Sequence, residues 1–311
     1  MRAPRIAVVV VTYNSADVLP GCLRSLRDGG ADGVDLTDVV VVDNASSDKS
    51  TEIAKAFDEL PVTVVQQLDN AGYAAGVNAG VRALSGPSPE AVMVLNPDCR
   101  LRPGALATLA GALQVRGRGI IAPQLLNPDG SLQPSLRRLP TIGGVLAESI
   151  LGGRVADRLG VGELIFTHGP HDRPGPSAWA TGAALLISRP LLDGVGPWDE
   201  SFLLYSEETE YQLRAADLGW TTWYEPAAVI EHKGGEADTR PDLAALLTIN
   251  RVRLFKRRHG AISGLAYAAA LTLGVALRAA AGQRTARAAL AALVFPSRRI
   301  TSLAELQGEQ R

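Results

Sequence analysis

The feature that most constrains the fold is a short, wholly apolar run of mostly β-branched residues that recurs between helical segments. Residues 6–11 form one such run and residues 39–42 form another. Apolar runs this short, with no polar alternation, are typical of strands buried on both faces of a parallel sheet. Between them, residues 17–27 place apolar side chains at helical spacing. Such strand–helix–strand units predict an α/β fold with a Rossmann-like, mainly parallel central sheet flanked by helices.

The alternation extends along much of the chain but is interrupted at residues 117–176, which are rich in proline and glycine. That composition predicts loops and short elements. Residues after 242 have a helical pattern as far as about residue 292. The other expected elements are helices at 50–60, 104–115 and 206–218 and strands at 62–66, 91–95, 183–188, 220–224 and 228–230.

Composition and charge exclude several classes of protein. The chain has 311 residues, 46% of them hydrophobic, and its 31 basic and 32 acidic residues give a net charge of −1. This balance argues against a protein built around non-specific nucleic-acid binding. The two cysteines cannot form a disulfide framework or a four-sulfur zinc site, so a reducing cytoplasm is expected. The first apolar run, six residues long, is too short for the core of a signal peptide.

Residues 261–277 form a 17-residue stretch without a charge, near the lower length limit for a membrane-spanning helix. Because the stretch is rich in alanine and glycine, it fits a buried or dimer-forming helix and, somewhat better, a helix lying against a membrane face. The basic residues that precede it are Arg251, Arg253, Lys256, Arg257 and Arg258. They fit a solvated helix face and a face bound to anionic lipid equally well.

Four polar clusters follow expected strands, where ligands bind beyond the carboxyl ends of an open parallel sheet. They occupy residues 12–14, 43–44, 70–73 and 96–98. A single cluster fits an ordinary turn, but four in register are much harder to explain as turns. No G-x-G-x-x-G follows the first strand and no P-loop lysine occurs, which argues against dehydrogenases and P-loop enzymes.

A second set of candidate residues lies beyond residue 175. Glu207, Glu208 and Glu210 fall within four residues, which fits a solvated helix N-terminus because the helix dipole favours acids there. Acids at such a position are also candidates for acid–base chemistry. His232 follows an expected strand and fits either a structural histidine or a metal ligand.

Six short motifs occur in the order seen in family-2 inverting glycosyltransferases, and the chain resembles that family. They are VVVVTYN, VVDNASSD, NAGYAAGVNAG, LNPD, WATGA and DESFLLYSEETEY. The LNPD form and the segment NPDGSLQPSLRRLP are most similar to the bacterial rhamnosyltransferase-like branch. The resemblance covers about residues 5–260 and implies a GT-A fold, a nucleotide-diphosphate sugar donor and a divalent metal.

The resemblance also implies roles for individual residues on the donor side. Asp98 takes the position of the family's metal-binding aspartate, and His232 adds a second ligand to Mg²⁺ or Mn²⁺, which favours Mn²⁺. Asp43 accepts hydrogen bonds from the base or the ribose. The implied nucleotide-sugar-binding residues are Thr12, Tyr13, Asn14, Asp43, Asn70, Gly72, Asn78 and Asp98.

On the acceptor side, the resemblance places Glu208 at the family's general-base position and Glu207 beside it, where it positions the acceptor. Breaking a sugar–diphosphate bond requires stabilised leaving phosphates and a base for the acceptor hydroxyl, so these roles agree with the chemistry. The implied acceptor-binding residues are Trp179, Thr181, Gly182 and Glu207.

Three features depart from the family pattern. Arg100 stands where the metal motif often has a second acid, and Ser206 stands where an aromatic residue often precedes the acidic pair. Glu208 and Glu210 replace positions where aspartate is frequent, which moves each carboxylate outward by one methylene. These differences alter the expected geometry more than the expected activity.

We therefore expect a metal-dependent inverting glycosyltransferase with a GT-A domain at residues 1–240 and a C-terminal helical extension at 241–311. Its nucleotide-sugar half spans about residues 1–115 and its acceptor half about 116–240. The expected donor is dTDP-L-rhamnose, and the expected acceptor is a polyprenyl-diphosphate-linked glycan of cell-wall or polysaccharide assembly. The expected location is the cytoplasm, at the inner face of the plasma membrane.

Alternatives remain open from the sequence. They are a transferase that uses another donor such as a UDP-sugar, a non-catalytic module that binds a nucleotide sugar or a glycan, and a sugar nucleotidyltransferase. Intact Asp98, Glu208 and His232 argue against the non-catalytic module, and the lack of a glycine-rich basic loop after Val11 argues against the nucleotidyltransferase. No nucleic-acid partner is expected, and a homodimer contact is the alternative to membrane contact for residues 261–277.

Overall fold

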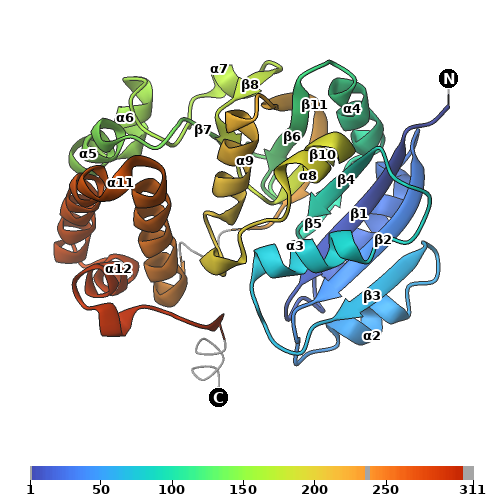
Figure 1. The fold of residues 1–311 in the computed structure, drawn as a ribbon, viewed down its shortest axis with the longest axis horizontal. Coiled ribbons are helices and arrows are strands. Elements are labelled where there is room, and N and C mark those ends of the chain that lie inside the picture. Colours follow the sequence, from blue (N-terminus) through green and yellow to red (C-terminus); the bar gives the residue numbers. More distant parts are fainter. Residues whose placement is uncertain (1, 235–238, 304–311) are drawn as a thin grey trace.

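A computed structural model describes residues 2–234 and 239–303. Figure 1 shows a twisted sheet with helices on both faces and, to one side of it, a separate group of helices. That group contains α5 (Ile142–Leu151), α6 (Gly153–Arg158), α11 (Pro241–Ala280) and α12 (Arg284–Val294). The GT-A-type layered α/β arrangement predicted from the sequence is confirmed, together with its C-terminal helices.

The described residues form a nine-stranded sheet in the order β3-β2-β1-β4-β10-β6-β11-β5, with β8 paired to β11. A separate two-stranded sheet joins β7 to β9. The strands are β1 (Arg5–Thr12), β2 (Asp35–Asp43), β3 (Val62–Gln66), β4 (Ala91–Leu95), β5 (Cys99–Leu101), β6 (Arg118–Leu126), β7 (Leu136–Arg137), β8 (Gly175–Ser177), β9 (Trp179–Ala180), β10 (Ala184–Ser188) and β11 (Thr221–His232).

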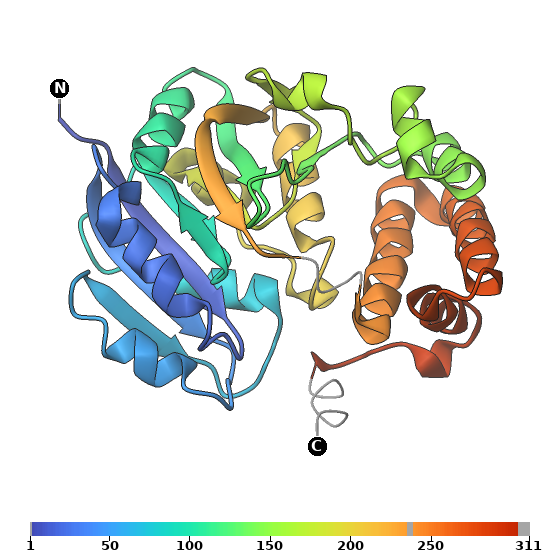
Figure 2. The ribbon, with the colours of Figure 1, turned by 180° about the vertical axis from the view of Figure 1, so that it is seen from behind.

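The first four strands run parallel, whereas β10 is antiparallel to both of its neighbours, β4 and β6. Apolar side chains cover both faces of the central strands, as their unalternating sequences predict. One face packs against α3 (Tyr73–Arg82), α8 (Arg189–Val195) and α9 (Glu207–Asp217), seen in Figure 1. The opposite face packs against α1 (Leu19–Ser25), α2 (Ser50–Lys55) and α4 (Ala105–Leu113), and Figure 2 shows α1 and α2 in front of it.

Three elements differ from the sequence expectations. The helix expected at 50–60 ends at Lys55. The two strands expected at 220–224 and 228–230 are one strand, β11, whose pairing with β6 shifts register between Glu225 and Val229. Pro226 lies in that irregular stretch, where its missing N–H removes no regular ladder bond.

The segment expected to contain loops and short elements holds one longer helix, α5, besides α6 and α7 (His168–His171). Thr141 caps α5, because its hydroxyl oxygen accepts the N–H of Gly144 at 2.9 Å. Ser149 of α5 donates its hydroxyl to the carbonyl of Ala270 at 2.9 Å. Residues from the middle of the chain therefore anchor the C-terminal helices.

The apolar stretch 261–277 lies in the second half of α11, after a reversal at Gly260, whose φ is 84°. Its Tyr267 and Leu271 are buried in a cluster with α5 and α12. Ile262 and Leu265 on the same stretch are 86% and 72% exposed. α11 is long and apolar enough to cross a membrane, but 33% of its most apolar 18-residue stretch is buried inside the protein. The stretch is thus partly a packed core and partly an apolar surface.

The basic cluster at 251–258 joins the C-terminal helices to the rest of the fold. Arg251 forms an ion pair with Glu163 at 2.5 Å. The guanidinium groups of Arg257 and Arg258 pair with Asp199 at 2.7 Å and Asp217 at 2.8 Å; the guanidinium of Arg253 donates to the Ser201 carbonyl. Arg257 and Arg258 are nevertheless exposed, as expected for a solvated helix face, whereas Arg251 and Arg253 are half-buried against the rest of the chain.

Candidate active site

The carboxyl ends of β1 and β2 place buried polar side chains side by side. Thr12 and Asp43 are register partners, and Asp43 is fully buried. One carboxylate oxygen of Asp43, Oδ2, accepts the N–H of Ser46 at 3.1 Å. Its other oxygen, Oδ1, and the hydroxyl of Thr12 are buried without a hydrogen-bond partner among the described residues. Since unsatisfied buried acceptors are costly, this edge is suited to a ligand that supplies donors.

The loops next to the carboxyl ends of β1 and β2 contain Asn14 and Gly72. Both residues have a positive φ angle. Asn14 has φ of 47°, and its side-chain oxygen accepts the N–H of Ser47 at 2.8 Å. Gly72 has φ of 101°, and its N–H donates to the side-chain oxygen of Asn70 at 3.2 Å. A Cβ atom on Gly72 would lie 2.1 Å from the carbonyl oxygen of Leu203, so only glycine fits there.

Asn78 differs from its expected role in nucleotide-sugar binding. The residue is 5% exposed on α3. Its amide nitrogen donates to the carbonyl of Trp198 and the carboxylate of Glu200, each at 2.9 Å, and its oxygen accepts the N–H of Trp198 at 2.9 Å. Because these bonds occupy its amide, we assign Asn78 to holding the segment around residue 198 and remove it from the binding set.

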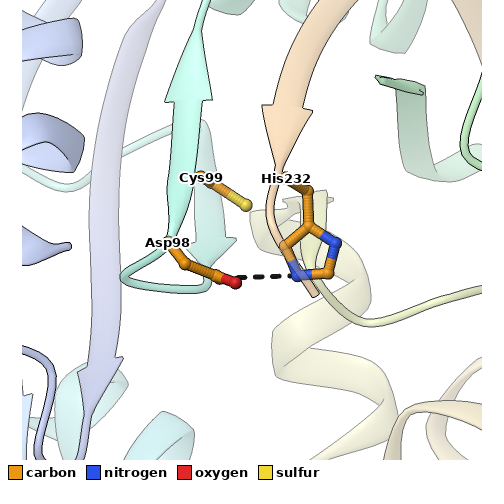
Figure 3. Close-up of side chains that lie close together, drawn as sticks. All are labelled: Asp98, Cys99 and His232. Atoms are coloured by element: carbon orange, nitrogen blue, oxygen red, sulfur yellow. Dashed lines mark ion pairs between the residues drawn. The ribbon is translucent and has the colours of Figure 1, made fainter. Parts of the chain in front are cut away.

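Asp98 and His232, the two expected metal ligands, lie together, as Figure 3 shows. The distance from Asp98 Oδ1 to His232 Nε2 is 3.4 Å. Asp98 precedes β5 and His232 ends β11, and these strands pair antiparallel with Cys99 opposite His232. The other oxygen of Asp98, Oδ2, accepts the N–H of Gly234 at 2.9 Å. A strand pairing between residues far apart in the sequence thus creates the site.

Gln133 fixes the proton on the His232 ring. The amide nitrogen of Gln133 donates to Asn127 Oδ1 at 2.9 Å and to the His232 carbonyl at 3.2 Å. Its amide oxygen therefore faces His232 Nδ1 at 2.6 Å and accepts a proton from it. Burial lowers the pKa of His232, which keeps the ring neutral. The lone pair of Nε2 is consequently directed toward Asp98, as in a histidine that binds metal.

Cys99, the third group near this pair, has different chemistry. The ligand atoms of Asp98, Cys99 and His232 all lie within 4.8 Å of one another (Figure 3). Burial raises the pKa of the Cys99 thiol well above its usual range, and its sulfur donates to the carbonyl of Ala183 at 3.4 Å. Metals bind the thiolate, so the neutral thiol leaves a carboxylate and an imidazole as the donor set. Arg100, which replaces an acid of the family motif, donates away from the site to the Val18 carbonyl at 2.7 Å.

The expected acid pair begins α9. Glu207 is 3% exposed, and both Glu207 and Glu208 have an Oε2 atom buried without a partner among the described residues. Burial raises the pKa of Glu207 well above its usual range, and the adjacent charge of Glu208 raises it further. Burial also raises the pKa of Glu208, which backbone N–H groups and the charge of Arg137 counteract. The two carboxyl groups therefore titrate as one interacting pair, and burial makes each hold its proton more strongly than an exposed glutamate does.

The loop before the acid pair is strained. Leu203, Tyr205 and Ser206 have φ of 63°, 68° and 74°, a region that non-glycine residues rarely adopt. Asn250 of α11 holds this loop, because its buried amide nitrogen donates to the carbonyls of Phe202, Leu204 and Tyr205 at 2.7, 2.9 and 3.1 Å. The C-terminal helix thereby fixes the loop that presents the two carboxylates.

Tyr73, the first residue of α3, contacts the strand segment that adjoins the acid pair. Burial raises the pKa of its hydroxyl, and nearby acidic groups, Cys99, Glu207, Glu208 and Asp98, raise it further. The hydroxyl donates to the carbonyl of Gly182 at 3.1 Å. A Cβ atom on Gly182 would lie 3.0 Å from the Glu208 Cβ, so the glycine lets this strand approach the acid closely.

The remaining expected acceptor residues are held by backbone contacts. Trp179 is 8% exposed, and its indole N–H donates to the Arg138 carbonyl at 3.1 Å. The N–H of Thr181 donates to the carbonyl of Ser135 at 3.0 Å. Tyr13, expected on the donor side, lies half-buried between Thr12 and Asn14.

Sequence reasoning missed three residues that support the site: Tyr73 as a partner of Gly182, Gln133 and Asn250. Tyr73 and Gln133 lie inside motifs that carried the family resemblance, NAGYAAGVNAG and NPDGSLQPSLRRLP. A search of those motifs for polar side chains would have found both. Asn250 lies in the helical extension without any motif, and the sequence contains no signal for its contact 48 residues upstream.

The layered sheet, its polar carboxyl edge and the carboxylate-rich site define a nucleotide-sugar-type GT-A architecture. Solved structures share the fold: a mannosyltransferase of Pyrobaculum calidifontis in complex with GDP-Man and Mn²⁺ has a TM-score of 0.58 at 20% identity, with 94% of this chain and 80% of that chain covered. GalNAc-T7 with UDP, GalNAc and Mn²⁺ has a TM-score of 0.59 at 14% identity, with 80% of this chain and 48% of that chain covered.

The chain belongs to glycosyl transferase family 2, whose profile matches residues 7–166, and it is a glycosyltransferase. It is 30% identical over 259 residues to the N-acetylglucosaminyl-diphospho-decaprenol L-rhamnosyltransferase of Mycobacterium tuberculosis, covering 76% of this chain and 78% of the relative. It is 29% identical over 211 residues to the low-salt glycan biosynthesis hexosyltransferase Agl10 of Haloferax volcanii, covering 68% of this chain and 61% of that relative.

Proposed function

We propose that this glycosyltransferase transfers L-rhamnose from dTDP-L-rhamnose to a hydroxyl of a polyprenyl-diphosphate-linked glycan, with inversion at the sugar carbon. The observation that carries the proposal is the pairing of Asp98 with His232 at 3.4 Å, together with buried Glu207 and Glu208 at the start of α9, against Gly182. Support for the sugar and the acceptor comes from the name of the mycobacterial relative.

The donor set at Asp98 and His232 fits Mn²⁺ or Mg²⁺. A carboxylate oxygen and a neutral imidazole nitrogen face each other at 3.4 Å, and Gln133 holds the ring in the tautomer that a metal requires. Asp98 and His232 would hold the cation through one oxygen and one nitrogen ligand, a set that favours Mn²⁺. When bound, the cation neutralises the charge that develops on the leaving diphosphate.

Different residues of the chain then have different roles in the transfer. Glu208 accepts the proton of the acceptor hydroxyl while the hydroxyl oxygen forms a bond to the anomeric carbon of the sugar. The bond from that carbon to the diphosphate oxygen breaks, and its electron pair leaves with the nucleoside diphosphate. Thr12, Asn14 and Asp43 bind the nucleotide, and Glu207 positions the acceptor beside Glu208.

The other expectations about the chain enter this proposal unchanged. Residues 1–240 form the GT-A domain and residues 241–311 the extension. The enzyme works in the cytoplasm at the inner face of the plasma membrane, and the exposed apolar residues of α11, Ile262 and Leu265, contact lipid. A homodimer formed through the same residues is the alternative.

A panel of nucleotide sugars tests the proposed function. A ligand that binds only the folded state raises the melting temperature, by an amount that grows with its concentration over Kd. We expect dTDP-L-rhamnose to give the largest increase and Mn²⁺ to enlarge it. A larger increase with a UDP-sugar would reassign the donor, and no increase with any nucleotide sugar would refute the function.

A further inference from the structure

A large groove lies beside the acid pair, outside the residues assigned above to donor and metal. Its volume is about 970 Å³, at the upper end of the range for small-molecule sites. Apolar side chains form most of its walls, including Leu139, Val161, Ile165 and Pro176. Leu139 and Val161 are 56% and 47% exposed, so the groove opens to the surface through apolar groups.

One end of this groove contains a cation that lacks a carboxylate partner. Arg137 lines the groove, and its guanidinium donates only to the backbone carbonyls of Pro134 and Leu136, at 3.0 and 2.9 Å, among the described residues. The neighbouring arginines differ, since Arg138 pairs with Asp157 at 2.9 Å and Arg251 with Glu163 at 2.5 Å. Burial lowers the pKa of Arg137, and the charges of Glu163, Glu208 and Glu148 partly offset this effect.

Arg137 also lies next to the reaction centre. It belongs to β7, which pairs with β9 so that Arg137 is opposite Trp179. Its guanidinium lies 5.7 Å from the centre of the Trp179 ring. The next residue of β9, Ala180, is joined to the start of α9 by Gln212, whose amide nitrogen donates to the carbonyls of Ala180 at 2.7 Å and Glu208 at 3.0 Å. A ligand that fills the groove and meets Arg137 therefore ends beside the strand that adjoins Glu208.

We infer that this groove binds the prenyl chain of the acceptor and that Arg137 binds its diphosphate, an inference that rests on the proposed function. The apolar walls match a hydrocarbon chain. The guanidinium of Arg137, which forms no ion pair with a carboxylate among the described residues, matches the phosphate oxygens at its head. Arg173, an exposed residue on the rim, adds a second positive charge. The sugar attached to the diphosphate then extends past Trp179 to Glu208.

The groove offers a position where it can be blocked without disturbing the fold. A Cβ atom on Gly143, which lines the groove on α5, meets nothing within 4 Å. Gly143→Phe therefore places a ring in open space within the groove. Gly111 on α4 is the matched control, because a Cβ atom there also meets nothing within 4 Å and the residue does not line the groove.

Calorimetric titration of the full chain with farnesyl diphosphate, farnesol and inorganic diphosphate tests the inference, without donor or turnover. We expect farnesyl diphosphate to bind more tightly than either of the others. Gly143→Phe should weaken it by at least about tenfold, and Gly111→Phe should leave it unchanged. Arg137→Gln should reduce the preference for farnesyl diphosphate over farnesol by roughly 10- to 100-fold, the loss expected for charge-assisted hydrogen bonds.

Several outcomes would overturn the inference. They are unchanged farnesyl diphosphate binding in Gly143→Phe, an unchanged preference in folded Arg137→Gln, and a shift of oligomeric state in Gly143→Phe, which would make the groove a contact between two copies. Titration of dTDP-L-rhamnose with Mn²⁺ into the same proteins separates the two claims. If dTDP-L-rhamnose binds and farnesyl diphosphate does not, the inference about the groove alone is refuted. If farnesyl diphosphate binds and no nucleotide sugar does, the proposed function alone is refuted.

Discussion

The donor edge and the acceptor edge of the site are built in different ways. Thr12 and Asp43 are the last residues of β1 and β2. The apolar residues before them, 6–11 and 39–42, are 0–6% exposed, so the core itself fixes the donor edge. Glu207 and Glu208 instead follow a loop with three positive-φ residues, held by Asn250 from another part of the chain. Strand ends of a packed sheet need no further support, whereas a strained loop persists only when its surroundings hold it.

Because of this difference, substitutions at the two edges should have different effects. Changes at the donor edge should alter metal and nucleotide binding, and changes at the acceptor edge should alter turnover and acceptor affinity. The C-terminal helix belongs functionally to the acceptor edge, because Asn250 and Arg253 both contact the segment that precedes α9.

The largest effect is expected for Glu208→Gln, which keeps the shape of the side chain and removes the base. Turnover should fall by roughly 10²- to 10⁴-fold, the usual contribution of a positioned base, while donor binding survives. Steady-state kinetics measures the fall.

Glu207→Gln should act mainly on the KM for the acceptor. Glu210→Gln is the matched control because Glu210 pairs with Arg214 at 2.9 Å. Normal turnover in Glu208→Gln with a dead Glu207→Gln would exchange the two roles.

The next largest effect is expected at the metal pair. Gln133→Ala frees the His232 ring to rotate and to change its tautomer, and loss of such a supporting hydrogen bond typically costs 10- to 100-fold in metal affinity. Titration with Mn²⁺ in the presence of donor measures this. Gln114→Ala, at the end of α4, serves as control. An Mn²⁺ affinity equal to that of the unmodified protein would show that His232 is a structural histidine.

Asn250→Ala tests the link between α11 and the acid pair. Three carbonyls lose their donor, so the free energy of unfolding should fall by roughly 1–3 kcal/mol. Turnover should also fall, with Mn²⁺-dependent donor binding preserved. Thr248→Ala is the control on the same helix, since its hydroxyl donates only to the Ala244 carbonyl one turn away. Equal turnover in the two variants would mean that the clamp does not position the carboxylates.

The smallest effect is a pH dependence of stability. The pKa of Glu207 is higher in the folded protein than its ordinary value of 4.5, so its contribution to stability is complete below about pH 4.5 and is lost as pH rises through the folded-state pKa. Glu207→Gln stays neutral at every pH. Denaturant unfolding should therefore show the variant gaining stability relative to the unmodified protein as pH increases from about 5. A difference that does not change with pH would contradict the raised pKa.

The same contrast explains what the sequence could predict. The apolar runs within β1, β2 and β4 reveal their strands because burial on both faces leaves no polar alternation, and polar candidate residues stand at their carboxyl ends. Asp98 and Glu208 were predicted from the family motifs, because their expected roles follow from their positions within short segments.

The acceptor edge was less predictable because long-range contacts determine it. Asn78 lies in a motif yet bonds to residues 198–200, and only the packing of α3 shows this. From the sequence, the basic residues of α11 fitted a solvated face and a lipid-bound face equally well, because their partners, such as Asp199 and Asp217, lie far away in sequence. The contact of Asn250 could not be predicted for two reasons. Asn250 lies within a helix that carries no motif, and its hydrogen-bond acceptors are backbone carbonyls of a segment far away in sequence.

The division of the site into a donor edge with the metal pair and an acceptor edge with the base is tested most directly by titrating dTDP-L-rhamnose with and without Mn²⁺. The proteins compared are the unmodified chain, Asp98→Ala and Glu208→Gln. We expect the gain in donor affinity caused by Mn²⁺ to vanish in Asp98→Ala and to be unchanged in Glu208→Gln, although the latter has lost turnover. Retention of the Mn²⁺ effect in Asp98→Ala, or its loss in Glu208→Gln, would contradict the account.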